Sequence, residues 1–364
     1  MLDRLLGALD PELVQSQVIC LAGDGPIAER IRARQVPLQV LGLPATARAL
    51  AGLPRLIARL HEIRPDVIHT WMYHADFLGG IAGKTLGAPV IWALHATTLD
   101  PAQTRRATRW LVDALARLSA HVPERIVSCS QVGLEAHRSM GYDAQKLVVV
   151  PNGFDTTRFQ KNGASRTAAR ARWGVSDDDI VIGHVARFHP QKDHRSLLAA
   201  AAICIETEPR LRFVCLGMDV SPSNSALADQ ARELGIMERC HFLGPTTSVE
   251  NELPGFDLLV SSSRFGEAFP LVIGEAMACE VPCVVTDVGD SAFIVGDTGA
   301  LVPPGDPGAL ADALLRMARL SRAERERLGA QARARIETKF SLAYVAELYT
   351  QVYRAAARAD RQGG

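Results

Sequence analysis

The chain has 364 residues, with 40 Lys and Arg residues balancing 40 Asp and Glu residues, and hydrophobic residues make up 48% of it. This length suits two domains with buried cores, and the composition is that of a globular protein rather than a disordered one. A net charge of zero argues against a nucleic-acid-binding protein, which would carry a basic surplus. No apolar run approaches the roughly 20 residues that a membrane-spanning helix needs.

Short apolar runs alternate with amphipathic helical stretches along the chain, which is typical of βαβ units around parallel sheets. The first half predicts strands at 16–22, 37–42, 66–70, 89–94, 125–129 and 147–150. The second half predicts strands at 180–186, 211–216, 239–243, 257–261, 282–286 and 300–302. Helices are expected between them, for example at 45–63, 104–120, 193–207, 273–279, 308–319, 322–338 and 341–359. Asn152-Gly153 and the polar stretch to about 176 predict a linker between two doubly wound α/β domains.

The seven cysteines form no CxxC pair, and most of them lie inside apolar runs such as Phe213-Val-Cys215-Leu. This pattern favours reduced core thiols over a disulfide framework or a zinc site. The first ten residues are helical in pattern and carry acidic side chains, unlike a secretion signal. We therefore expect a cytoplasmic protein.

Two cations follow the strand predicted at 180–186. Arg187 and Lys192 stand five residues apart in a loop, and Asp193 can cap the helix that comes next. In doubly wound sheets, ligands bind beyond the carboxyl ends of the strands, so these cations predict a diphosphate site. A solvated loop with a helix cap is an equally good interpretation of this segment alone.

Two acids follow the strand predicted at 257–261. Glu267 precedes Pro270, which suits a helix start, and Glu275 lies on an early turn of that helix. The free amides that follow Pro270, at 271–273, can hold phosphate oxygens, and both carboxylates can accept hydrogen bonds from sugar hydroxyls. The alternative is that a Glu near a helix N-terminus complements the helix dipole. That alternative explains Glu275 but leaves Glu267 and an exposed Phe269-Pro270 without a reason.

In the first half, His95 follows the strand at 89–94, and Tyr73 and His74 follow the strand at 66–70. A lone histidine at a strand end is more often structural than functional. Tyr73 and His74 suit sugar recognition, but core packing with a capping Asp76 explains them equally well. The segment 105–118 predicts a helix with cationic and apolar faces, and packing against its own sheet is favoured over contact with lipid.

A dinucleotide site is disfavoured. The run Gly23-Asp-Gly25-Pro-Ile-Ala28 fits the GxGxxA fingerprint, but that motif requires an acid about 20 residues further on. No Asp or Glu stands between Glu29 and Glu62, so no nicotinamide cofactor is expected. We expect no metal and no other cofactor.

Several motifs, in order and spacing, resemble the family 4 retaining glycosyltransferases, which are group 1 glycosyl transferases. The motifs are Val150-Pro-Asn-Gly-Phe-Asp155, Arg187-Phe-His-Pro-Gln-Lys192, Phe265-Gly-Glu267-Ala-Phe-Pro270, Glu275-Ala-Met-Ala-Cys279, Val281-Pro-Cys-Val-Val-Thr-Asp287-Val-Gly289 and Gly299-Ala-Leu-Val-Pro-Pro-Gly305. The resemblance extends over nearly the whole chain from about residue 10. It implies the GT-B fold, with two facing Rossmann-like domains at 1–155 and 156–340 and a terminal helix and tail, 341–364, that crosses back onto the first domain.

The resemblance also implies roles for individual residues. Arg187 and Lys192 bind the donor diphosphate in place of a metal, Glu267 contacts the transferred sugar and Glu275 accepts from the ribose. His95 reaches the donor sugar and phosphate from the first domain. The other residues matched to donor binding are Leu271, Val272, Ile273, Phe269 and Asn152, and those matched to the acceptor side are Tyr73 and His74.

The implied activity is transfer of a hexose, with retention, from a UDP-, GDP- or ADP-sugar to a cell-surface polysaccharide or a lipid-linked acceptor. Nucleic acid is not an expected partner, and peripheral contact with the inner face of the cytoplasmic membrane is a weaker expectation. Family members begin with a strand and a Gly-rich loop, whereas this chain opens within the following helix, so we expect the first domain to lack its N-terminal central strand. A catalytically impaired nucleotide-sugar-binding remnant and a GT-B sugar-nucleotide epimerase therefore stay open as alternatives.

Overall fold

The structure, a computed structural model, describes residues 1–44, 47–95 and 106–363. The chain forms two compact units. Unit 1 holds Met1–Gly153 together with Leu342–Gly364, and unit 2 holds Phe154–Ser341. All twelve predicted strands are present in the described part of the chain. The starts of the helices predicted at 45–63 and 104–120 lie outside the described residues.

Unit 2 contains a six-stranded parallel sheet covered by helices on both faces. Its strands are β7 (Ile180–Val185), β8 (Leu211–Leu216), β9 (Cys240–Phe242), β10 (Leu258–Ser261), β11 (Cys283–Thr286) and β12 (Ala300–Val302), in the order β12-β11-β10-β7-β8-β9. The central strands β7, β10 and β11 are mostly apolar, and all of their residues except Val185 are buried, because neither of their faces meets water. The strand order reverses between β7 and β10, which makes their carboxyl ends the topological switch point of the sheet.

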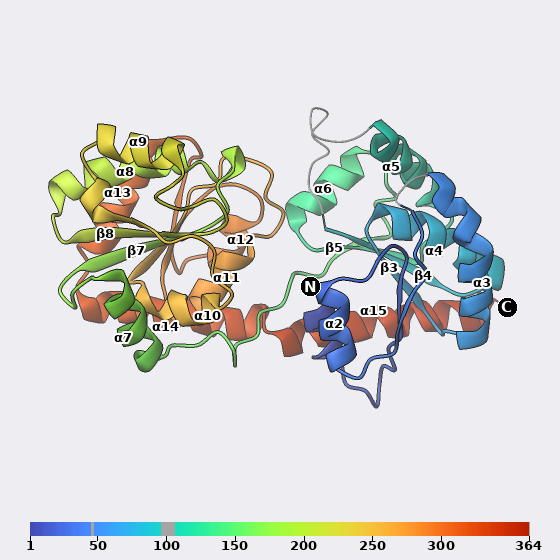
Figure 1. The fold of residues 1–364 in the computed structure, drawn as a ribbon. Helices are drawn as coiled ribbons and strands as arrows, with labels where there is room; N and C mark the ends of the chain where they lie inside the picture. Colours follow the sequence, from blue (N-terminus) through green and yellow to red (C-terminus); the bar gives the residue numbers. More distant parts are fainter. Residues whose placement is uncertain (45–46, 96–105, 364) are drawn as a thin grey trace. The chain divides into compact units, whose positions relative to one another are not determined.

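The helices of unit 2 connect these strands. They are α7 (Gly163–Trp173), α8 (His194–Thr207), α9 (Ser225–Glu233), α10 (Val249–Glu252), α11 (Leu271–Ala278), α12 (Ser291–Val295), α13 (Pro307–Ala318) and α14 (Arg322–Lys339), with short 3₁₀ turns η2 (Pro190–Lys192), η3 (Met237–Arg239) and η4 (Leu253–Gly255). Figure 1 shows α8, α9 and α13 on one face of the sheet and α7 and α14 on the other. Asp193 caps α8 as predicted, because its carboxylate accepts a hydrogen bond from the Ser196 amide.

Unit 1 contains two separate parallel sheets. β1 (Val18–Cys20) pairs with β2 (Leu38–Val40), and the second sheet has the order β3 (Ile68–Trp71), β4 (Val90–Leu94), β5 (Arg125–Ser128) and β6 (Leu147–Val149). The helices are α1 (Leu2–Leu6), α2 (Pro26–Ala33), α3 (Leu53–Ile63), α4 (Tyr73–Leu86), α5 (Arg106–Leu118), α6 (Gln131–Ser139) and α15 (Leu342–Gly363), with η1 (Ala47–Gly52) before α3. The division arises because β1 and β3 are not hydrogen-bonded to each other.

Helix α15 completes the core of unit 1 although it comes last in the sequence (Figure 1). Its residues Val345 and Tyr349 are at most 1% exposed and pack in one cluster with Ile91 of β4 and Val127 of β5. Helices α3, α4 and α5 contribute to a separate cluster, which includes Trp92 of β4. Successive residues of β4 thus point to opposite faces of a sheet that is covered on both sides.

Helix α5 uses its apolar side for packing, which agrees with the favoured interpretation of segment 105–118. Val112 and Leu115 are buried in the core of unit 1. The other side of the helix bears Trp110, which is 78% exposed, between the exposed Arg106 and Arg117. Within the described ranges, no helix is both long enough and apolar enough to span a bilayer.

The seven cysteines, all in the described part of the chain, form no disulfide with one another, and six of them are buried. Burial raises the pKa of the Cys204 and Cys279 thiols to about 12. These groups are protonated near neutral pH and pack as small apolar side chains, as predicted.

Candidate active site

The predicted site residues of unit 2 gather at the switch point of its sheet. Strands β7 and β10 are direct neighbours, with Ile182 opposite Leu258. The loop after β7 carries Arg187 and Lys192, and the loop after β10 carries Glu267. Because parallel strands end at the same edge of a sheet, these two loops lie next to each other.

Lys192 and Glu267, predicted from separate segments, form an ion pair. The Lys192 Nζ lies 2.5 Å from Glu267 Oε1, and the Ser263 hydroxyl donates to the same oxygen at 2.7 Å. The side chains of Lys192 and Glu267 are 20% and 10% exposed, so a ligand can still reach them. A partly desolvated pair of this kind is held more firmly than a surface ion pair.

Hydrogen bonds on both sides of Glu267 hold its loop against the neighbouring strand β11 and the loop that follows it. The Thr286 hydroxyl at the end of β11 donates to the Ser263 carbonyl oxygen at 2.6 Å. The amide of Asp290 donates to the carbonyl oxygen of Ala268 at 3.0 Å. Glu267 lies between these two bonds, so its backbone has little freedom to move.

Gly289 allows the next loop to approach the backbone of Glu267. Its φ is +62°, and a Cβ atom at this position would lie 2.5 Å from the Glu267 carbonyl oxygen. A side chain here would have to push the Glu267 backbone away, because real Cβ atoms essentially never approach so closely. Glycine is therefore required by both the conformation and the space.

A second set of contacts holds the backbone of Lys192. The Ser262 hydroxyl donates to the Lys192 carbonyl oxygen at 2.8 Å and lies 3.3 Å from Nε2 of His184. The ring of His184, on β7, meets the ring of His194 edge to face at 4.7 Å. The two adjacent serines after β10 thus reach both members of the ion pair, one through the lysine backbone and one through the glutamate side chain.

Arg187 stands apart from this ion pair. Its side chain is exposed and makes no ion pair with any residue that the structure describes. Gly217, at the end of β8, has a φ of +151°, and a Cβ there would lie 2.0 Å from the Ala186 carbonyl oxygen. The backbone leading to Arg187 is therefore closely packed while its guanidinium is free to meet an anion.

The N-terminus of α11 offers free amides beside the ion pair. Pro270 precedes the helix, and the amides of Leu271 and Val272 have no acceptor among the described residues. The Ile273 amide already donates to the Pro270 carbonyl oxygen, at 3.3 Å. Glu275 lies one turn further along and is 8% exposed.

The prediction that Phe269 and Pro270 are exposed is wrong, because both residues are buried. The side chain of Phe269 is 5% exposed and packs against Phe154 and Phe340, with ring centroids 6.0 and 5.9 Å away. The aromatic ring therefore belongs to the core of unit 2, because the turn before α11 directs it inward. Only its backbone remains available to a ligand.

In unit 1, His95 is partly buried at the end of β4. Its ring stacks on Trp71 at 4.7 Å and 11°, and its Nε2 has no hydrogen-bond partner among the described residues. Burial, with a smaller contribution from the positive N-terminus, lowers the pKa of His95 to about 4. The imidazole is thus neutral near pH 7 and can exchange hydrogen bonds without carrying charge.

Tyr73 is a core residue, in agreement with the structural alternative for its segment. Its hydroxyl lies 2.9 Å from Nε2 of His137, and burial raises its pKa to about 12. His74 is exposed on the first turn of α4. The expected cap by Asp76 is wrong, because α4 has Met72 at its N-cap without a side-chain cap; Asp76 lies inside the helix, fully buried, and the Thr70 hydroxyl donates to it at 2.6 Å. Asn152, the remaining predicted residue of unit 1, is buried two residues before the connection to unit 2.

Sequence reasoning missed the residues that support the ion pair, namely Ser262, Ser263 and His184. The signal that could have found the serines is their position, because polar residues directly after a central strand face the ligand edge of a doubly wound sheet. His184 carries no such signal, since it occupies an apolar strand position and is buried.

We expect unit 2 to lose stability below pH 6.5 through His184 and His194. Burial lowers the pKa of His194 to about 4, with smaller contributions from Asp193, which raises it, and Lys192, which lowers it. Burial, followed by His194 and Lys192, lowers the pKa of His184 well below its usual value. Between pH 6.5 and about 4, only the unfolded chain binds these protons, so the free energy of unfolding falls as the pH falls. Each group contributes up to about 1.4 kcal/mol per pH unit.

Urea denaturation at pH 7.5 and 5.5 measures this effect. The His194→Phe variant should lose less stability between the two pH values than the wild type. His121→Phe, at an exposed position, should keep the wild-type dependence. An equal loss in wild type and His194→Phe would contradict the expectation.

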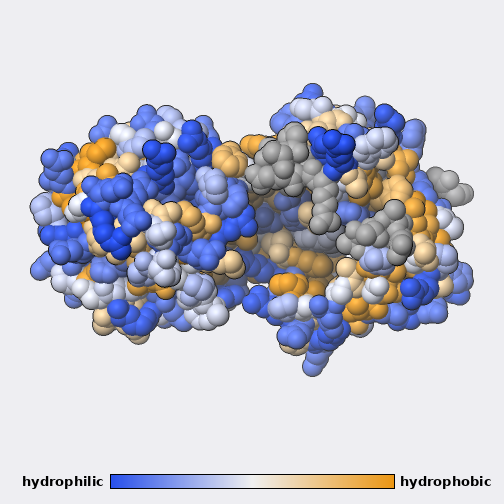
Figure 2. All heavy atoms as spheres, turned by 45° about the horizontal axis from the view of Figure 1, so that its top comes forward, coloured by the Kyte–Doolittle hydropathy of each residue, from blue (hydrophilic) through white to orange (hydrophobic). Residues whose placement is uncertain are grey.

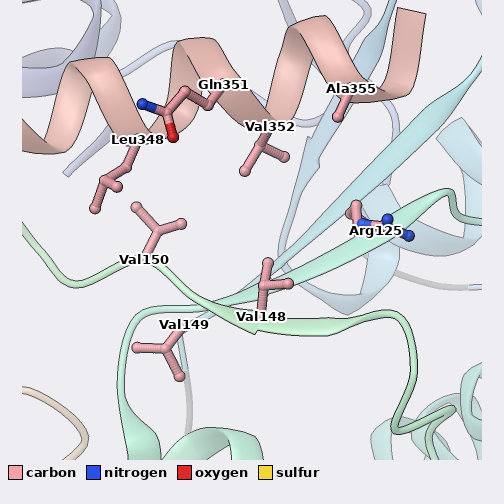
Figure 3. Close-up of a pocket in the computed structure, with 8 residues that line it drawn as sticks. All are labelled: Arg125, Val148, Val149, Val150, Leu348, Gln351, Val352 and Ala355. Carbon is pink, nitrogen blue, oxygen red and sulfur yellow. The ribbon is translucent and has the colours of Figure 1, made fainter. Parts of the chain in front are cut away.

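A groove in unit 1 lies apart from these residues (Figure 3). It runs between α15 and the edge strand β6 and is lined by Arg125, Val148, Val149, Val150, Leu348, Gln351, Val352 and Ala355. None of the predicted site residues lines it.

On the face drawn in Figure 2, hydrophilic residues cover most of unit 2, with hydrophobic residues scattered between them. Across the described residues, no group of three His, Cys, Asp or Glu side chains is placed to hold a metal ion.

Two family models match the chain, Glycosyltransferase Family 4 over residues 1–158 and Glycosyl transferases group 1 over residues 179–319. The D-inositol 3-phosphate glycosyltransferase of Saccharomonospora viridis is 32% identical over 325 residues, which are 81% of this chain and 71% of the relative. EpsF of Bacillus subtilis, named as a glycosyltransferase, is 32% identical over 219 residues, which are 59% of this chain and 56% of the relative. The chain thus spans between 56% and 71% of the length of these relatives.

Solved structures share the architecture. Anabaena HepE, crystallised in complex with UDP, matches with a TM-score of 0.83 at 22% identity, over 97% of this chain and 96% of that chain. A glycosyltransferase from Rickettsia africae matches with a TM-score of 0.83 at 16% identity, over 97% and 94% of the two chains. The family models, the relatives and the shared architecture together show that the chain belongs to glycosyltransferase family 4 and has the GT-B fold.

Proposed function

We propose that this protein transfers a hexose from a nucleotide-diphosphate sugar to a glycan or lipid-linked acceptor, with retention of the anomeric configuration. The observation that carries the proposal is the Lys192–Glu267 ion pair at the switch point of unit 2. Arg187 on the same loop and the free amides of Leu271 and Val272 add further donors for phosphate. An anion and a polyhydroxylated sugar are the two chemical groups that this set of side chains suits.

The reaction follows from where charge develops. As the bond between the sugar and the β-phosphate breaks, negative charge grows on the phosphate and positive charge on the sugar ring. Lys192 and Arg187 would neutralise the phosphate, together with the amides at the start of α11. Glu267 would bind a hydroxyl of the transferred sugar and Glu275 those of the ribose. The acceptor would attack from the face that the phosphate leaves, and a phosphate oxygen would take its proton.

The donor is best sought first among uridine nucleotides. The relevant neighbour, Anabaena HepE, was crystallised with UDP and with UDP-glucose. A thermal-shift screen with UDP-, GDP- and ADP-sugars tests the proposal, because a ligand at 100 times its Kd stabilises the folded state by about 2.7 kcal/mol. We expect one nucleotide class to raise the melting temperature of the wild type. The same nucleotides should not raise the melting temperature of Lys192→Met. No shift with any nucleotide sugar would contradict the proposal.

Two alternatives make different products. A sugar-nucleotide epimerase would convert the donor sugar without an acceptor, whereas a transferase releases the nucleoside diphosphate only when the sugar moves to an acceptor or to water. A binding remnant would give a thermal shift and no product at all. Product analysis with and without acceptor separates the three, and inositol 3-phosphate belongs in the acceptor panel because relatives are named for it.

The remaining assignments rest on the resemblance. We propose domain boundaries at 1–155, 156–340 and 341–364, with unit 1 on the acceptor side. His95 keeps the role in donor binding that the resemblance implies. A cytoplasmic location suits both the supply of nucleotide sugars and seven cysteines that form no disulfide with one another. Peripheral membrane contact finds little support in α5, whose apolar side faces the core.

A further inference from the structure

The two oxygens of the Glu267 carboxylate have different surroundings. Oε1 accepts hydrogen bonds from both the Lys192 ammonium, at 2.5 Å, and the Ser263 hydroxyl, at 2.7 Å. Oε2 receives no hydrogen bond from any residue in the described ranges, yet it is not among the fully enclosed polar atoms. One oxygen is therefore fixed by the protein, and the other is open to a ligand.

We propose that Ser263 is a positioning residue that determines which hydroxyl of the transferred sugar Glu267 recognises. Together with Lys192 it fixes Oε1, so that Oε2 points at the sugar in one orientation. This inference rests on the proposed function and adds to it a residue that sets sugar specificity. Ser263 itself does not touch the sugar.

The surroundings of Ser263 suit this role. Ser263 is 2% exposed and lies two residues after the end of β10. Its position is therefore set by the sheet. Its carbonyl oxygen accepts from the Thr286 hydroxyl at 2.6 Å, which fixes the backbone. An ionised carboxylate only accepts hydrogen bonds, so the hydroxyl of Ser263 must donate its single proton to Glu267.

Lys192 alone would not fix the carboxylate in the presence of donor. The ammonium has three protons on a flexible stem, and the incoming diphosphate competes with Glu267 for them. Ser263 is 2% exposed, so its hydroxyl is out of reach of such a competitor. The serine therefore keeps Oε1 in place when the lysine turns toward phosphate, and this is the moment at which sugar recognition matters.

The neighbouring Ser262 provides a contrast. Its hydroxyl bonds to the Lys192 carbonyl oxygen and not to Glu267. Loss of the Ser262 hydroxyl should therefore weaken phosphate binding, whereas loss of the Ser263 hydroxyl should affect the sugar. The two adjacent serines should thus affect different ends of the donor, Ser262 the nucleotide and Ser263 the sugar.

The test compares Ser263→Ala, Ser263→Thr and Ser119→Ala with UDP and UDP-glucose as probes. Ser119 is a matched control, since it is 1% exposed, donates to the Ala116 carbonyl oxygen at 2.6 Å and lies in unit 1. For Ser263→Ala we expect kcat with UDP-glucose to fall about tenfold or more, the size of one hydrogen bond to a charged group. The Kd of UDP, which lacks the sugar, and the melting temperature should stay within twofold and 2 °C of wild type.

Two further readouts distinguish positioning from a merely structural role. The ratio of kcat/KM for UDP-glucose over UDP-galactose should move toward one in Ser263→Ala, because a loose carboxylate discriminates less between epimeric hydroxyls. Ser263→Thr keeps a hydroxyl and should recover part of both kcat and the ratio. Unchanged kcat and ratio in Ser263→Ala would overturn the inference, as would parallel losses of UDP affinity and melting temperature. Failure of the wild type to bind UDP or UDP-glucose would instead count against a uridine donor, and the same variants would then be compared with the nucleotide sugar that the thermal-shift screen identifies. Failure to bind any nucleotide sugar would count against the proposed function itself.

Discussion

Replacing Lys192 by methionine is expected to lower turnover with a nucleotide sugar by about 10²–10³-fold. The substitution keeps an unbranched side chain of similar length and removes the charge that would meet the departing phosphate. The ammonium is held 2.5 Å from Glu267, so it is already in place before the donor binds. Steady-state kinetics with the donor identified by the thermal-shift screen measures the loss.

A matched lysine tells this effect apart from the loss of any ion pair. Lys161 lies 3.1 Å from Glu280, also in unit 2, and its side chain is 57% exposed. Lys161→Met should leave turnover unchanged, since exposed ion pairs contribute at most about 1 kcal/mol. If Lys192→Met retains wild-type turnover, the assignment of the phosphate site is wrong.

The second large effect is expected from Gly289→Ala. A methyl group at this position would lie 2.5 Å from the Glu267 carbonyl oxygen and 2.9 Å from its Cβ. Because the contact is with backbone, Glu267 must move, and a shift of about 1 Å in a catalytic group can cost about 100-fold in rate. We expect kcat to fall by roughly that factor, with a loss of about 1–2 kcal/mol in folding stability from the left-handed conformation.

Gly305→Ala is the control for backbone strain. Gly305 has a similar φ of +71°, but the nearest atom to a Cβ there is in the Arg264 side chain, at 3.6 Å. It should lose similar stability and keep its turnover. Steady-state kinetics measures the turnover of both variants, and urea denaturation measures their folding stability. Equal turnover in the two variants would contradict the role of Gly289 in placing Glu267.

The sequence predicted the strands well because their apolar, β-branched runs are short and bounded by polar turns. It also predicted a ligand edge at the loops after β7 and β10, since Lys192 and Glu267 follow these two strands. It could not predict that the two side chains meet, because their distance depends on the order of strands in the sheet. Phe269 was misplaced for a related reason, as its direction is set by the tertiary packing of Phe154 and Phe340.

The split of unit 1 into two sheets lay equally beyond the sequence pattern. Both β1 and β3 have ordinary strand sequences, and hydrogen-bond pairing between strands leaves no mark on either one. Ser263 was overlooked because a serine after a strand usually ends that strand. Its bond to Glu267 becomes visible only when the loop is placed against β11.

The discontinuous make-up of unit 1 has a consequence for how the protein is synthesised. The ribosome delivers residues 342–363 only after Phe154–Ser341, yet Val345 and Tyr349 cover Ile91 and Val127 in the folded unit. At roughly 5–20 residues per second, the nascent first 153 residues wait about 10–40 s with that face uncovered while Phe154–Ser341 is translated. An apolar surface exposed for this long can bind chaperones. A stop codon shortly before α15 would leave that surface permanently exposed.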